Sequence, residues 1–168
     1  MLFNTPQVQI IDDQDHQAVV KITGYYNTGV NANNLVVQAN TLFGANNSRA
    51  CILSVNSWEY SSSLSNGFIT LEWVSTANQN TTIFSVGRFN DGAIARYVPN
   101  NANTPTGDIN LVTANAQPGD CFSIVLSLMK EFNGNKIANN YLGVVTTGAN
   151  GAGAWANTQA GYNNQFGY

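Results

Sequence analysis

Apolar residues recur at every second position in several segments of the chain, and this period is the feature that most constrains the fold. The segment 122–128 carries Phe, Ile, Leu and Leu at alternate positions, and the segments 69–73 and 51–55 repeat the pattern. A period of two places one face of a strand on a core and the other face in solvent. Helical spacing is scarce, and Asn, Thr, Val and Gly disfavour helix interiors. The chain is therefore predicted to be all-β.

Strand-like segments are separated by clusters of Asn, Gly, Pro and Asp, the residues that favour turns. The predicted strands span residues 8–12, 17–26, 35–39, 50–60, 67–75, 82–88, 93–98, 108–114 and 121–132. Eight or nine short strands at this spacing predict an antiparallel β-sandwich, with a jelly roll as the leading topology.

The composition changes after Phe132, where a run rich in Gly, Ala, Asn and Thr begins. We predict one β-sandwich domain over residues 1–132 and an extended C-terminal arm over residues 133–168, because so little of the arm is available for burial. Aromatic side chains punctuate the arm, and we predict that they anchor it to a partner. These partner-binding residues are Tyr141, Trp155, Tyr162, Phe166 and Tyr168. The alternative interpretation is a tail that packs on its own sandwich or stays disordered.

Charged residues are few, and their distribution narrows the possible partners. They make up 9% of the chain, against about 25% in an average soluble domain, and 26 asparagines help to give a neutral surface rich in amides. The six Lys and Arg residues are scattered and the net charge is −3, so we expect no nucleic acid as a partner.

The opening residues lack the basic start and apolar run of a signal peptide, and no apolar run is as long as a membrane span. We therefore expect a soluble product made in a cytoplasm, with no membrane partner.

The two cysteines, Cys51 and Cys121, are too few for a disulfide framework and lack the spacing of metal ligands. Each lies in an apolar stretch. We predict that both are buried thiols on core faces.

The sequence carries no recognised catalytic or metal-binding pattern. His16, the only histidine, follows an acidic turn at 12–15 that lacks the glycine and terminal glutamate of a calcium loop. No nucleophile motif accompanies His16, and nothing in the sequence pairs Glu59 with Glu72 as glycosidases require. The glycines of 148–153 lack the Lys-Ser/Thr ending of a phosphate loop. We predict no enzymatic activity, no metal and no cofactor.

Trp58 and Tyr60 lie on one face of a predicted strand, with Asn56 beside them. An exposed aromatic pair next to an amide is a plausible platform for a sugar. The alternative, which we favour for a side chain as large as Trp, is burial against a second layer or a subunit.

Two stretches carry a resemblance to a known group of proteins. The opening Gln9-Ile10-Ile11-Asp12-Asp13, followed by the Val-Val-Lys-Ile-Thr-Gly strand at 19–24, resembles small structural proteins of tailed bacteriophages, especially those of marine and cyanobacterial hosts. The stretch from Thr106-Gly107-Asp108-Ile109 through Gly119-Asp120 to the strand at 122–126 resembles them too, as does the mid-chain Glu72-Trp73. The similarity covers residues 7–132 and consists of strand and turn patterns rather than a catalytic signature. The Gly-rich extension after Phe132 departs from the compact forms of these proteins.

The resemblance implies a non-enzymatic component of the virion, made in the host cytoplasm. Our first expectation is a capsid decoration protein that binds the major capsid protein and other copies of itself, because many copies multiply weak contacts by avidity. The alternatives are a neck, tail or fibre-associated subunit, and an adhesion module that binds host glycans.

Overall fold

The computed structural model describes residues 3–45, 51–77, 79–88 and 90–132. The chain divides into two compact units, Met1–Lys130 and Glu131–Tyr168. Glu131 and Phe132 are the described residues of the second unit. In the described ranges, no helix is both long and apolar enough to span a membrane.

The described residues form nine strands and one short 3-10 turn. They are β1 (Phe3–Asp13), β2 (Gln17–Tyr25), β3 (Val30–Val37), η1 (Ala39–Thr41), β4 (Cys51–Ser63), β5 (Phe68–Ser75), β6 (Thr81–Val86), β7 (Asn90–Ile94), β8 (Pro105–Ala116) and β9 (Cys121–Phe132). Each predicted strand overlaps one of these, so the all-β prediction is confirmed. Several strand boundaries were wrong by three or more residues, among them the start of β1, which is Phe3 rather than residue 8. Strand β3 begins at Val30 despite its three asparagines, because it pairs with β8 and such pairing overrides local propensity. Strand β7 ends at Ile94, and Val98 makes only an isolated bridge with Val55.

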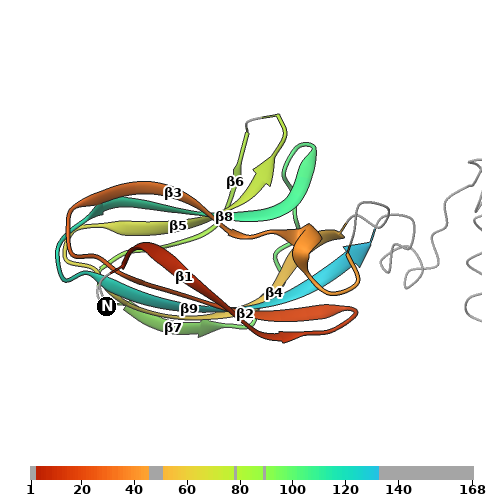
Figure 1. Cartoon of the computed structure of the whole chain (residues 1–168), viewed down its shortest axis with the longest axis horizontal. Helices are drawn as coiled ribbons and strands as arrows, with labels where there is room; N and C mark the ends of the chain where they lie inside the picture. Colours follow the sequence, from red (N-terminus) through yellow and green to blue (C-terminus); the bar gives the residue numbers. More distant parts are fainter. Residues whose placement is uncertain (1–2, 46–50, 78, 89, 133–168) are drawn as a thin grey trace, which may run out of the picture. The chain divides into compact units, whose positions relative to one another are not determined.

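The strands form two antiparallel sheets that face each other in a sandwich (Figure 1). The five-stranded sheet has the order β1-β2-β9-β4-β7, and the four-stranded sheet has the order β3-β8-β5-β6. The paired neighbours include β2 with β9, β3 with β8, β4 with β7, and β5 with β6. This nested pairing is that of one long hairpin rolled up on itself, which is the jelly roll. The predicted topology is therefore confirmed.

The core lies between the two sheets and follows the period seen in the sequence. On β9 the inward side chains Phe122, Ile124, Leu126 and Leu128 are buried, and on β5 Ile69, Leu71 and Trp73 are buried as predicted. Fully burying a side chain of this kind stabilises the fold by about 1.5–3 kcal/mol.

Gly107 occupies a place in this core that no other residue fits. Its φ of +93° lies in the left-handed region, and a Cβ atom there would collide with the carbonyl oxygen of Cys51. The start of β8 can therefore approach β4 only because residue 107 is glycine.

The start of β9 is held by a buried carboxylate, Asp120, which is 2% exposed. Its Oδ1 accepts hydrogen bonds from the backbone N–H and the hydroxyl of Ser65 at 2.9 and 2.7 Å, and its Oδ2 accepts one from Gln117 N at 2.8 Å. Burial raises the pKa of this carboxyl, but the three hydrogen bonds outweigh burial and leave the pKa below its ordinary value. We call Asp120, Ser65 and Gln117 the Asp120 cluster.

Near the other end of β9, Lys130 is 1% exposed. Its Nζ forms an ion pair with Asp13 and donates hydrogen bonds to the carbonyl oxygens of Gln14 at 2.5 Å and Phe43 at 3.0 Å. The second oxygen of Asp13 accepts a hydrogen bond from Phe43 N at 2.8 Å. This Lys130 cluster ties β9 to the β1–β2 turn and to the segment after η1.

Candidate functional site

The first candidate site is the open side of the sandwich, between the edge strands β1 and β3. Within the described ranges, β1 pairs only with β2, and β3 only with β8. Val8 and Ile10 lie opposite Ile22 and Val20 of β2, so their side chains point to the inner face of the sheet. They are nevertheless 43% and 49% exposed, so the inner face of this edge strand is only partly covered.

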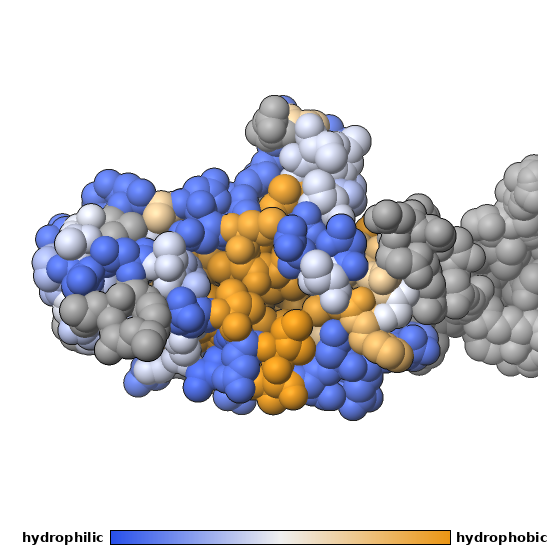
Figure 2. All heavy atoms as spheres, in the orientation of Figure 1, coloured by the Kyte–Doolittle hydropathy of each residue, from blue (hydrophilic) through white to orange (hydrophobic). Residues whose placement is uncertain are grey.

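The result is a groove with a volume of about 310 Å³ between β1, β3 and η1. The residues that line it include Val8, Ile10, Leu35, Val37, Thr41 and Leu42, and none of the lining residues is charged. Two more apolar side chains, Ile11 and Phe43, are exposed next in sequence to lining residues. Figure 2 shows an apolar area in the middle of this view, over the region between the two sheets. We call this site the apolar groove.

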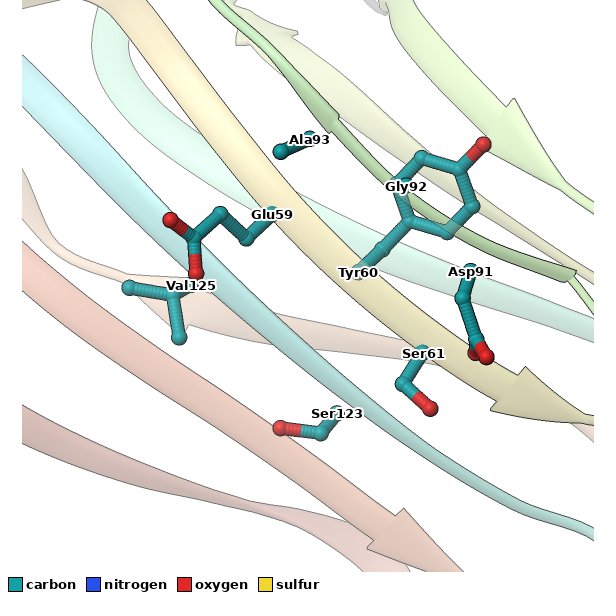
Figure 3. Close-up of a pocket in the computed structure, with 8 residues that line it drawn as sticks. All are labelled: Glu59, Tyr60, Ser61, Asp91, Gly92, Ala93, Ser123 and Val125. Carbon is teal, nitrogen blue, oxygen red and sulfur yellow. The ribbon is translucent and has the colours of Figure 1, made fainter.

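The second candidate site is a shallow hollow of about 330 Å³ on the outer face of the five-stranded sheet. Its floor carries short side chains from three neighbouring strands, with a carboxylate on β4 and another on β7 (Figure 3). The lining residues include Glu59, Ser61, Asp91, Ala93, Ser123 and Val125. Ser61 lies opposite Asp91, and Glu59 lies opposite Ala93. We call this site the hydroxyl hollow.

The predicted sugar platform at Trp58 and Tyr60 is not an exposed aromatic pair. Trp58 is 6% exposed and stacks on Phe84 of the opposite sheet, with ring centroids 4.7 Å apart and planes 6° apart. Our preference for burial of Trp58 is therefore confirmed. Tyr60 is half-buried, and its ring lies against Gly92, the residue opposite it on β7.

The polar residues of the β1–β2 turn make hydrogen bonds and an ion pair that stabilise the fold. Asp12 accepts a hydrogen bond from Gln14 Nε2 at 2.9 Å, Asp13 belongs to the Lys130 cluster, and the carbonyl oxygen of His16 accepts one from Lys130 N at 3.0 Å. No three His, Cys, Asp or Glu side chains gather as metal ligands in the described part of the chain. Glu59 and Glu72 belong to different sheets.

The prediction for the cysteines was half wrong. Cys51 is buried at the start of β4, but Cys121 is only half-buried. Cys121 precedes the inward-pointing Phe122, so the alternation of β9 places it on the outer face. These two described residues are not bonded to each other.

The five aromatic residues predicted to bind a partner lie outside the described residues. They are Tyr141, Trp155, Tyr162, Phe166 and Tyr168. Neither candidate site found in the structure was predicted from the sequence. The exposed Val8 and Ile10 have the spacing of core residues, and the hydroxyl hollow is assembled from three strands that are distant in sequence.

No protein-family model and no curated protein sequence matches the chain. Among solved structures, a mutant of the family 29 carbohydrate-binding module CBM29-2 is similar, with 8% identity and a TM-score of 0.34 over 75% of this chain and 86% of that one. A second family 29 carbohydrate-binding module has 11% identity and a TM-score of 0.33 over 75% and 89% of the two chains. A structure of infectious bursal disease virus has 19% identity and a TM-score of 0.22 over 75% of this chain and 32% of that one. Similarity at this level does not assign the chain to a family or distinguish between functions.

The class that the structure defines is a jelly-roll β-sandwich with an uncharged apolar groove on its open side and a polar hollow on one outer face. Jelly rolls of this kind occur in viral capsids and in lectins, so the fold fits more than one function.

Proposed function

We propose that the chain is a non-catalytic structural subunit of a bacteriophage particle, a capsid decoration protein that binds neighbouring particle proteins through its apolar groove. The resemblance of residues 7–132 to phage structural proteins supplies the context. The observation that carries the proposal is the groove itself, where inward-pointing apolar side chains of β1 remain 43–49% exposed.

Exposed apolar side chains that gather in a groove mark an interaction surface, because isolated monomers rarely leave such patches open. The groove is uncharged along its lining, so a partner need not desolvate a charge to enter it. An uncharged surface also allows identical subunits to crowd together without repulsion. Repetition over many copies then multiplies a weak contact by avidity.

The test measures how many copies of each variant bind to particles. Ile10→Glu places a charge in the groove, and we expect at least a tenfold loss of occupancy because that carboxylate would have to be buried without a partner. The matched control is Ile94→Glu on β7, which changes another exposed isoleucine outside the groove. Circular dichroism and thermal midpoints must show that both variants fold. Equal occupancy by the two variants would refute the proposal.

The second candidate function is glycan binding, and the hydroxyl hollow favours it. Carboxylates and hydroxyls on an open, shallow floor are suitable partners for the hydroxyl groups of a sugar, since each accepts or donates hydrogen bonds. A glycan array with the full chain tests this function. Asp91→Ala should lose any signal, whereas Glu72→Ala on the other sheet should keep it. A signal that is equal in both variants would exclude the hollow as the site.

A further inference from the structure

We infer that the apolar groove of one copy binds residues 133–168 of a second copy, so that subunits are linked by exchanged C-terminal segments. This inference rests on the proposed function and names the partner of the same groove. The segment would add a strand to the free edge of β1 and place apolar side chains in the groove.

The groove has the two features that strand addition requires. Its walls are edge strands that pair on one side only within the described ranges, so their outward backbone groups are available for hydrogen bonding. Its volume of about 310 Å³ is at the lower end of the range of ligand sites, about 300–1,000 Å³. It therefore has room for one or two large side chains rather than for a folded domain.

The sequence of residues 133–168 matches this site in charge and in anchors. Lys136 is its only charged side chain, so an uncharged segment meets an uncharged groove. The run Tyr141-Leu142-Gly143-Val144-Val145 has the aromatic and β-branched residues that favour strands. Trp155 and Tyr162 supply further aromatic side chains of the kind that carry most of the energy in protein interfaces.

The first unit of the chain ends beside the groove. Its last residue, Lys130, is bonded to the carbonyl oxygen of Phe43, and Phe43 follows Leu42, which lines the groove. A segment as long as residues 133–168 can extend on the order of 100 Å. It is therefore long enough to reach the groove of a second copy.

The experiment mixes two full-length variants and measures association by sedimentation velocity. The groove variant, Ile10→Glu, keeps an intact segment, and the segment variant, Trp155→Ala with Tyr162→Ala, keeps an intact groove. We expect the wild type to associate in a concentration-dependent way and each variant alone to associate at least tenfold more weakly. An equimolar mixture should form one-to-one dimers, because one variant offers the segment and the other offers the groove. The control Ile94→Glu should associate like the wild type.

Three results would overturn the inference. A wild type that is monomeric at every concentration has no exchanged segment. If both variants are monomeric and their mixture is too, the groove is not filled by a second copy. If the segment variant associates as the wild type does while Ile10→Glu does not, the groove binds another part of the subunit. That last result leaves the proposed function intact, which particle occupancy tests separately.

Discussion

The two ends of β9 are both fixed by buried charged side chains, but the charges are balanced in different ways. Among the described residues, the hydrogen-bond donors to Asp120 are two backbone N–H groups and a hydroxyl, and none of them is a cation. Lys130 is balanced by a full countercharge, Asp13, and by two carbonyl oxygens. A carboxylate can thus be buried by dipoles alone when three donors converge on it, whereas the ammonium group here has an ionic partner.

The largest effect is expected at Lys130. Lys130→Ala should destabilise the domain by about 3–5 kcal/mol, because it removes one partner of a buried ion pair and leaves Asp13 and two carbonyls without it. Lys130→Met is the matched control, since it keeps most of the aliphatic stem and removes the charge together with its hydrogen bonds. The free energy of unfolding in urea measures both. A large loss in Lys130→Ala with little loss in Lys130→Met would mean that packing of the stem, and not the ion pair, holds this end.

A smaller effect is expected at the other end of the strand. Asp120→Ala should cost about 1.5–3 kcal/mol, the usual value of hydrogen bonds to a charged group, because Ser65 N and Gln117 N would lose their acceptor. Asp120→Asn keeps one acceptor oxygen of the same shape, so its loss should be smaller. Urea unfolding of the two variants gives the comparison. If Asp120→Ala loses less unfolding free energy than Lys130→Met does, the backbone and hydroxyl dipoles contribute little at this end.

The Asp120 cluster also predicts how stability changes in acid. The pKa of Asp120 is lowered in the folded protein, so its contribution is fully present above the ordinary pKa of about 3.9 and is lost as pH falls through the folded pKa. Unfolding free energies of the wild type and Asp120→Asn should therefore converge in acid. Each proton bound contributes at most about 1.4 kcal/mol per pH unit. Curves that stay parallel down to pH 2 would contradict this.

The sequence predicted the strands better than it predicted these clusters. Lys130 continues the spacing of Phe122, Ile124, Leu126 and Leu128, but its burial was not predicted from the sequence. Its partners were beyond prediction, because Phe43 and Gln14 are 87 and 116 positions away. The exposure of Val8 and Ile10 was not predicted either, because it depends on β1 lying at the edge of its sheet, which local spacing does not show.

The smallest effect is expected at Tyr26, whose backbone N–H bonds to the carbonyl oxygen of Asp120. Its hydroxyl lies 2.8 Å from the Thr113 hydroxyl in the core. Tyr26→Phe should cost about 1 kcal/mol, the usual net value of one buried hydrogen bond. A double-mutant cycle with Thr113→Val tests whether that energy belongs to this pair. No coupling between the two changes would assign the loss to Tyr26 alone.

Burial raises the pKa of the Tyr26 hydroxyl, although the hydrogen bond with Thr113 opposes it. Its contribution to stability is therefore complete below the ordinary pKa of about 10 and is lost as pH rises through the folded pKa. Tyr26→Phe should remove that alkaline loss, which unfolding between pH 9 and 12 would measure.

The nested pairing of the strands has a consequence for how the chain folds during synthesis. The pair β5 and β6 is close in sequence and closes a short loop. Strands β2 and β9 also pair, but almost the whole sequence of the sandwich separates them. Closing such distant pairs costs the most chain entropy and slows folding. The five-stranded sheet also cannot be completed until β9 has left the ribosome, because β9 lies at its centre between β2 and β4. The inner hairpins can therefore form first, whereas β1 and β2 remain without their central partner until β9 has emerged.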